Sequence, residues 1–231
     1  EGYLNRLVAN GHKVAICEQV EDPKLAKGIV KREVIRVVTP GTNMDIQALD
    51  ESKNNYIMCI VYLADKYGIS LADVSTGDYY VTEVDSERKL IDEINKFAPS
   101  EIVCNESFYM SGVDLEDMRH RIGITIYSLD AWYFSDETAE TTLKGHFHVN
   151  SLEGLGLNDY AYGTIAAGAL LKYLYETQKN DLDHISAIHP YSTGKFMIID
   201  SSTRRNLELV ETMREKQKRG SLLWVLDKTK T

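Results

Sequence analysis

The chain has 231 residues, of which 43% are apolar, so it can bury a core and form one or two domains. Its formal net charge of −9 argues against a protein that grips nucleic acid over its whole surface, because such binding comes mostly from Lys and Arg. The longest nearly unbroken apolar run, Tyr56 to Ala64, is far too short for a membrane span of roughly 20 residues, and three scattered cysteines (Cys17, Cys59 and Cys104) without a C-x-x-C pair favour a reducing, cytoplasmic setting.

The first 46 residues predict a helix followed by two strands. Leu4, Leu7 and Val8 recur at helical spacing within Tyr3 to Ala9, and Asn10-Gly11 is a typical helix stop. His12 to Cys17 and Glu33 to Val38 are rich in residues that favour strands, and Thr39-Pro40-Gly41-Thr42 predicts a turn. We place a domain boundary near Asp45.

The next segment predicts an antiparallel meander. Tyr56 to Leu63 is apolar on both faces, as in a central buried strand, and the strands Ile69 to Val74 and Tyr79 to Val84 follow after turns at 65–68 and 75–78. Asp85 or Ser86 then caps a helix that Pro99 stops.

Helices and strands alternate through the rest of the chain. The pattern predicts, in order, a strand at Glu101 to Cys104, a helix at Leu115 to Arg121, a strand at Ile124 to Leu129, a polar helix at Asp136 to Lys144, the longest helix from Asn158 through Tyr173, a strand at Phe196 to Ile199, a helix through Leu207, Val210 and Met213 ending at Gly220, and a last helix capped by Ser221. This order predicts an α/β fold with a ribonuclease H-like mixed sheet, flanked by partial domains.

No catalytic or metal-ligating residue is predicted. Nucleases of the ribonuclease H type hold two metal ions with carboxylates, one of them in the first strand, and Tyr56 to Leu63 carries no acid. Asp73 and Asp78 are explained by their turn, and the acids next to Cys17 would raise rather than lower the pKa of a thiol. A metal-dependent nuclease therefore stays only as the alternative function.

Other candidate motifs are weak. Ser192-Thr193-Gly194-Lys195 lacks the Gly and the Ser or Thr that a P-loop needs, and the hairpin of small residues at 73–77 lacks the second phosphate hairpin of an actin-like ATPase. His146 and His148 would share one face of a strand, as two metal ligands do, but histidines that are solvated or hydrogen-bonded are the favoured interpretation.

Five basic residues lie within thirteen positions and are the candidates for DNA contact: Lys24, Lys27, Lys31, Arg32 and Arg36. They could neutralise phosphates, although a solvated charged face is the alternative.

Four stretches together resemble the bacterial MutS DNA mismatch repair proteins: "GHKVAICEQVEDPKLAKGIVKREVIRVVTPGT", "SLADVSTGDYY", "SSTRRNLEL" and "GSLLWVLDKTKT". The resemblance spans nearly the whole chain in order and spacing. It implies that residues 1–46 are the C-terminal part of a mismatch-binding domain, 47–195 a ribonuclease H-like connector domain without catalysis, and 196–231 the start of a core or lever domain. We accordingly expect both ends to be cut from a longer chain.

The resemblance also implies the partners. MutS proteins are dimeric clamps that recognise mismatched duplex DNA, use ATP and Mg²⁺ at a distant ATPase domain, and recruit MutL. No Phe here is followed two residues later by Glu, so the mismatch-reading wedge of the family is expected before Glu1 and the ATP-binding motifs after Thr231. This fragment is thus expected to hold no cofactor, and Glu140, Thr141 and Thr142 on the polar helix are the candidate contacts for MutL.

Two mechanical expectations follow. Hinge motion is expected at Thr39 to Ile46 and at Pro190 to Ser201. Loss of apolar surface in Tyr56 to Leu63 is expected to destabilise the fold by several kcal/mol, and Asp73→Asn by far less.

Overall fold

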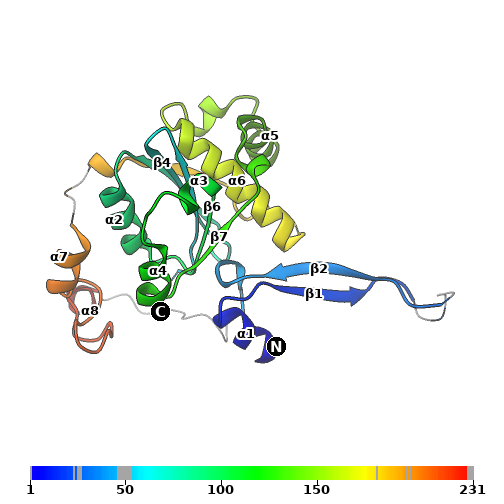
Figure 1. Cartoon of the computed structure of the whole chain (residues 1–231), viewed down its shortest axis with the longest axis horizontal. Helices are drawn as coiled ribbons and strands as arrows, with labels where there is room; N and C mark the ends of the chain where they lie inside the picture. Colours follow the sequence, from blue (N-terminus) through cyan, green and yellow to red (C-terminus); the bar gives the residue numbers. More distant parts are fainter. Residues whose placement is uncertain are drawn as a thin grey trace.

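The structure is a computed structural model that describes residues 2–22, 24, 28–45, 54–180, 182–195, 197 and 199–227. Its body is a six-stranded mixed sheet with helices on both faces, and a two-stranded hairpin projects far from that body (Figure 1). We call residues 2–45, which contain the hairpin, the arm. None of the helices in these ranges combines the length and apolar character needed to cross a bilayer.

The strand order of the sheet is β7-β6-β3-β4-β5-β8. Its strands are β3 (Ile57–Leu63), β4 (Lys66–Asp73), β5 (Asp78–Val84), β6 (Glu101–Cys104), β7 (Thr125–Ser128) and β8 (His189–Pro190). β3, β4 and β5 form the predicted antiparallel meander, whereas β6 runs parallel to β3, β7 to β6, and β8 to β5. The central position of the acid-free strand β3 is as predicted.

Alternate side chains of β3 enter two separate cores, because successive residues of a strand point to opposite faces. Ile57, Cys59 and Val61 pack beneath the helices α5 (Asp136–Phe147) and α6 (Ala161–Gln178). Met58 and Ile60 pack on the other face, with residues of α2 (Glu87–Phe97), α3 (Glu106–Tyr109) and the segment after α4 (Leu115–Asp117). This two-sided burial explains why the β3 sequence is apolar throughout.

Glycines allow the two large helices to pack closely. Gly68 of β4 faces the backbone of Tyr162, and Gly168 of α6 faces the backbone of Ala139 in α5, where a Cβ on either glycine would clash. The carboxylate of Glu83 accepts hydrogen bonds from the backbone N–H groups of Tyr162 (2.6 Å) and Gly163 (3.0 Å) at the first turn of α6. Helix α6 is thereby fixed on the sheet.

The arm consists of α1 (Gly2–Ala9) and the antiparallel strands β1 (Val14–Gln19) and β2 (Arg32–Val38), and ends in a short 3₁₀ turn at Pro40–Thr42. Each of these elements was predicted within a few residues. A register shift between Ile16 and Cys17 bends the hairpin.

Several predicted boundaries were wrong. β4 begins at Lys66, because the chain reverses at Ala64 and Asp65, both with positive φ, instead of at 65–68. Leu115 to Arg121 is not one α-helix, because α4 passes into a π-helical turn at Met118–Ile122. The longest helix starts at Ala161, after Tyr160, and not at Asn158.

The C-terminal segment differs most from expectation. Asp200 caps α7 (Ser201–Asn206), and Glu208 has a positive φ that ends the helix, so the predicted helix from Leu207 to Gly220 is replaced by turns. Ser221 caps α8 (Leu222–Leu226), as predicted. Of the predicted strand at 196–199, Phe196 and Ile198 lie outside the described residues, and Met197 and Ile199 are not in a strand.

Candidate functional site: the hairpin and its joint with the sheet

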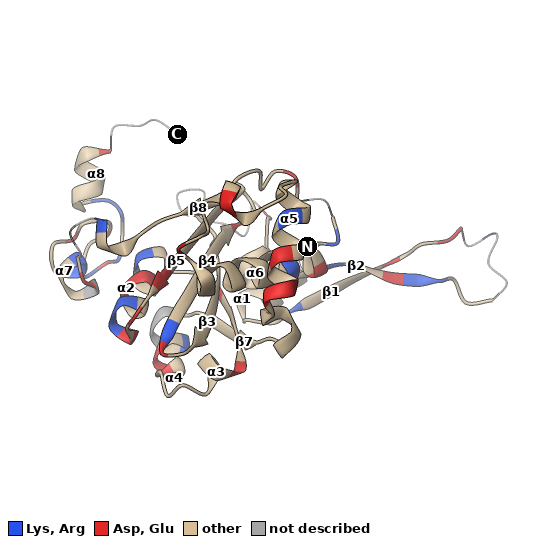
Figure 2. Cartoon of the chain, turned by 90° about the horizontal axis from the view of Figure 1, so that it is seen from above, with Lys and Arg blue, Asp and Glu red and all other residues tan. Residues whose placement is uncertain are grey.

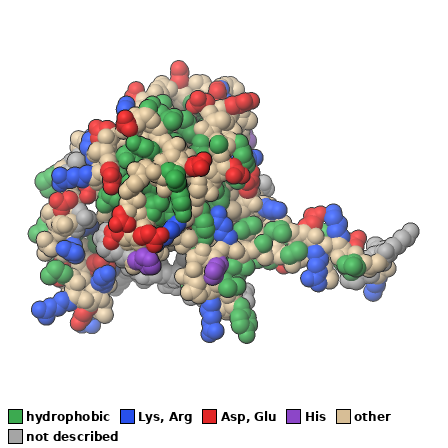
Figure 3. All heavy atoms as spheres, in the orientation of Figure 1, with side chains coloured by type: hydrophobic (Ala, Val, Ile, Leu, Met, Phe, Trp, Pro, Cys, Tyr) green, Lys and Arg blue, Asp and Glu red, His purple; other side chains and the backbone are tan. Residues whose placement is uncertain are grey.

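The hairpin carries the predicted DNA contacts on its projecting part. Lys24, Lys31 and Arg32 are exposed there, and Lys27 lies outside the described residues. Lys31 is paired with Glu33 at 2.5 Å, and its backbone N–H donates to Glu21 at 2.7 Å. The hairpin carries both acidic and basic side chains, as the charge-coloured views show (Figures 2 and 3).

Arg36 does not belong to that exposed group. Its guanidinium is half-buried at the base of the hairpin and donates to the backbone oxygen of Thr42 at 3.1 Å. Burial lowers the pKa of the Arg36 side chain. Arg36 is thus occupied in holding the 3₁₀ turn, and the structure does not gather the five predicted residues into one patch.

The joint between the arm and the sheet contains a buried carboxylate that sequence reasoning missed. We use "the joint" for Gly11, Lys13 and Thr39–Asn43 of the arm together with Glu101, Tyr127 and Tyr173 of the body. Glu101 is fully buried at the start of β6. It accepts hydrogen bonds from the Gly41 backbone N–H (3.0 Å) and the Tyr173 hydroxyl (2.7 Å).

Burial raises the pKa of Glu101, although its donors and the nearby Lys13 act in the opposite direction. Burial likewise raises the pKa of Tyr173, and the charge of Glu101 adds to that shift. Both shifts have the same cause, because a site with little access to water favours the neutral form of an acid.

Lys13 lies at the outer side of the joint. Much of its side chain is exposed, but its ammonium nitrogen lies 3.8 Å from the ring centre of Tyr127 and 5.0 Å from that of Tyr173. Desolvation of this head group lowers the pKa of Lys13, while Glu101 raises it. The Tyr127 hydroxyl donates to the backbone oxygen of Gly11 at 2.5 Å and so ties the turn after α1 to the edge strand β7.

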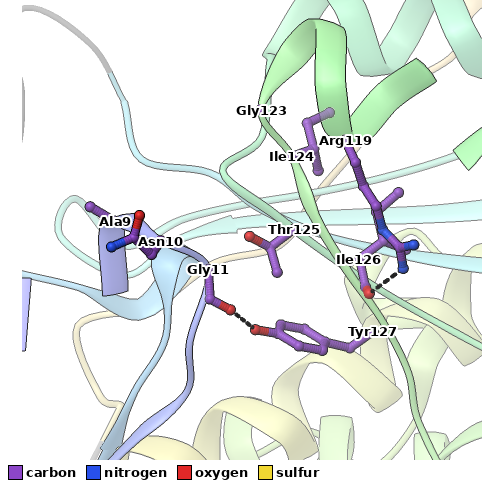
Figure 4. Close-up of a pocket in the computed structure, with 9 residues that line it drawn as sticks. All are labelled: Ala9, Asn10, Gly11, Arg119, Gly123, Ile124, Thr125, Ile126 and Tyr127. Atoms are coloured by element: carbon purple, nitrogen blue, oxygen red, sulfur yellow. Dashed lines mark hydrogen bonds between the residues drawn. The ribbon is translucent and has the colours of Figure 1, made fainter. Parts of the chain in front are cut away.

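An open cavity of about 420 Å³ lies beside this tie (Figure 4). The turn at Ala9–Gly11 lines one side, and Arg119 and the β7 residues Thr125 to Tyr127 line the other. Arg119 is already engaged, because its guanidinium donates to Glu116 (2.9 Å), the Tyr109 hydroxyl (3.0 Å) and the Ile126 oxygen (3.3 Å). The cavity therefore presents backbone and engaged side chains, with no assembled catalytic group among its lining residues.

The predicted partner-binding residues lie on α5. Glu140 and Thr141 are exposed and Thr142 is partly buried. Because successive residues of an α-helix are about 100° apart around its axis, the three side chains point in different directions. Glu140 is hydrogen-bonded to Lys144 one turn later.

The two histidines are not on a strand, because α5 extends through Phe147 and His148 caps it in a left-handed conformation. The two His146 ring nitrogens lie 2.6 Å from the Tyr175 hydroxyl and 2.7 Å from the Ile185 oxygen. His146 is therefore a hydrogen-bonded structural histidine, the interpretation that the sequence favoured. Among the described residues, no three His, Cys, Asp or Glu side chains form a group that could hold a metal ion.

The fold and these surfaces define a class: a mixed α/β module that carries a projecting β-hairpin on a buried polar joint. Comparison with protein families gives two matches, MutS domain I over residues 1–47 and MutS domain II over residues 55–186. The chain belongs to the MutS family.

Three relatives show how the chain relates to longer proteins. It is 63% identical over 231 residues to the DNA mismatch repair protein MutS of Lachnoclostridium phytofermentans, covering all of this chain and 25% of that protein. The proteins of the same description from Ruminiclostridium cellulolyticum and Protochlamydia amoebophila are 47% and 40% identical, again over all of this chain and 26% and 27% of their own lengths. The chain thus spans about a quarter of the relatives it matches.

Proposed function

We propose that this chain is the connecting part of a DNA mismatch repair protein of the MutS type. Residues 1–46 complete a mismatch-binding domain, 47–195 form the connector domain, and 196–231 begin the core domain. The observation that carries the proposal is the succession of matches to MutS domains I and II in one chain. The longer protein is proposed to be a dimeric, cytoplasmic, DNA-dependent ATPase that uses ATP and Mg²⁺.

The connector is proposed to be ribonuclease H-like. The sheet order supports this assignment, because an antiparallel meander, β5-β4-β3, is extended on the β3 side by the parallel strands β6 and β7. The role of this part is coupling and contact without catalysis. The nuclease alternative finds no support, since strand β3 carries no acid and no three acids among the described residues form a group that could hold a metal ion.

DNA contact by this chain is proposed to be weak and to depend on the exposed basic residues Lys24 and Arg32. We expect the wild-type chain to bind a mismatched duplex only at low salt, with affinity falling steeply as salt rises. The variant with Lys24→Glu and Arg32→Glu should lose most of that binding and have a smaller salt slope. Lys66→Glu, an exposed change on β4, is the matched control.

Fluorescence anisotropy over a salt series measures both quantities. Tight binding at physiological salt, or equal losses in the hairpin variant and the Lys66 control, would remove the hairpin from the proposal.

The α5 surface is proposed to contact MutL. A photo-crosslinking residue at Thr141 should capture purified MutL, whereas one at Met110, which is exposed near α3, should not. Equal capture from both positions argues against α5 as the docking surface.

Incubation of the chain with Mg²⁺ or Mn²⁺ and labelled branched or hybrid substrates tests for nuclease activity, and metal-dependent cleavage would overturn the non-catalytic role.

A further inference from the structure

At the joint, one buried carboxylate accepts hydrogen bonds from the arm and from the body. Glu101 receives a backbone donor from the arm, at Gly41, and a hydroxyl donor from the body, at Tyr173. Because a carboxylate only accepts, both donors must point inward at the same time. The position of Gly41 relative to helix α6 is therefore defined through Glu101.

The arm passes so close to the sheet that this position has little freedom. A Cβ on Gly41 would lie 2.7 Å from the Cβ of Ile57 and 3.0 Å from that of Glu101. The side chain of Asn55 also donates to the backbone oxygens of Pro40 (3.0 Å) and Asn43 (3.2 Å). Within the expected hinge at Thr39 to Ile46, Thr39 and Gly41 to Asn43 are thus buried, whereas Met44 is exposed. Motion at the buried residues would break these contacts.

Two further contacts, at the outer side of the joint, also hold the arm to the body. Tyr127 holds the Gly11 carbonyl, and Lys179, the residue that ends α6, donates to the backbone oxygen of Val34 in β2 at 3.0 Å. The arm is consequently held at three separate places: the turn after α1, the 3₁₀ turn and strand β2.

An acid in this place is not what stability alone would select. Burial disfavours its charged form, and buried polar groups with several partners define geometry more than they add stability. An apolar side chain could fill the same space, but it could not accept from Gly41 and Tyr173 together.

We propose that Glu101 is a positioning residue that fixes the direction of the hairpin relative to the sheet, so that the arm and the body move as one rigid unit. This inference goes beyond the proposed function and does not rest on it.

The test measures the distance between the hairpin and the body. Spin labels are placed at Glu18→Cys in β1 and Thr141→Cys in α5, two exposed positions, with the exposed Cys17 changed to Ser and the buried Cys59 and Cys104 left in place. Double electron–electron resonance on the 231-residue chain then gives the distance distribution. Wild type should give one narrow distribution.

Glu101→Gln keeps the shape of the side chain but replaces one acceptor oxygen by an N–H donor. We expect its distance distribution to be about twofold broader or displaced, because a neutral amide holds the two contacts less strongly than a carboxylate. Its urea midpoint should change little, because the Tyr173 hydroxyl can rotate to accept from the new amide and the Gly41 backbone N–H can keep an oxygen acceptor. A role in stability alone would lower the midpoint and leave the distribution unchanged. The proposal is overturned if Glu101→Gln gives the same distance distribution as wild type. It is also overturned if the wild-type distribution is itself broad.

Glu93→Gln provides the matched control. Glu93 is also a nearly buried acid and accepts from the Tyr191 hydroxyl at 2.5 Å, but it lies on α2, away from the arm. Its variant should keep the narrow distribution, and equal broadening in both variants contradicts the assignment to Glu101. If Glu101→Gln does not fold, Tyr173→Phe, which removes one of the two donors, is judged by the same criterion.

Discussion

Asp73 ends strand β4 and is fully buried. One of its carboxylate oxygens accepts from the backbone N–H (2.8 Å) and hydroxyl (2.6 Å) of Ser75. The other accepts from the Asn55 backbone N–H and the Asn54 side-chain amide, both at 3.0 Å. Asp73→Asn turns one of these oxygens into a donor, and whichever way the new amide points, it faces a backbone N–H that cannot rotate away.

The structure gives the size of this effect. Hydrogen bonds to a charged acceptor contribute about 1.5–3 kcal/mol each, and an orphaned buried donor costs a similar amount, so we expect Asp73→Asn to lose about 3 kcal/mol. The expectation from sequence, that this change is minor, is therefore revised. With a urea m-value of about 3 kcal/mol/M, the midpoint should fall by about 1 M.

Urea unfolding followed by circular dichroism measures this loss, and Asp78→Asn is the control. Asp78 lies in the same turn but is partly exposed, and its carboxylate accepts chiefly from the Thr76 hydroxyl at 2.9 Å. The control should lose about 1 kcal/mol or less. If Asp73→Asn loses no more than Asp78→Asn, the four hydrogen bonds do not carry the stability assigned to them.

Three further changes test the packing and the joint. Ile60→Ala empties a fully buried site in β3 and should cost about 2–5 kcal/mol in urea unfolding, whereas a loss below about 1 kcal/mol contradicts its burial. Gly168→Ala places a methyl group against the backbone of Ala139 and should reduce the free energy of unfolding by roughly 1–3 kcal/mol, which lowers the thermal midpoint by several degrees. An unchanged midpoint means that α5 can move away freely. Burial raises the pKa of Glu101 above its ordinary 4.5, so the folded state holds that proton more tightly than the unfolded state does. The stability of wild type relative to Glu101→Gln should therefore decline as the pH rises above about 4.5. A stability difference that is independent of pH between 4 and 8 contradicts the raised pKa.

The sequence predicted the strands and the best-capped helices because their signals are local. β3 is apolar on both faces because two cores meet it, and that burial is visible directly in the composition of Ile57 to Leu63. Ser86 accepts from the Lys89 backbone N–H at the start of α2, as its position before a helical stripe indicates. Such patterns need no knowledge of distant residues.

The joint could not be predicted in the same way, because its partners are far apart in the chain. Glu101 meets Gly41 and Tyr173 across 60 and 72 positions, and its only sequence signal is an acid at the first position of a strand. Arg36 looked like one member of a basic group, but Thr42 turns it inward. After Leu207 it was the local signal that misled: the apolar spacing predicted a helix, but Glu208 has a positive φ, which is not helical.

Helix α6 has 18 residues and is therefore about 27 Å long at 1.5 Å per residue. Its first turn is fastened to Glu83 on β5, Tyr173 in its second half to Glu101, and the residue that caps its C-terminus to β2 of the hairpin. It acts as a strut between the far side of the sheet and the root of the hairpin. If the arm and the body move as one unit, as proposed, a tilt imposed at the β5 side would reach the hairpin along this helix, and the length of the projecting strands would enlarge the displacement.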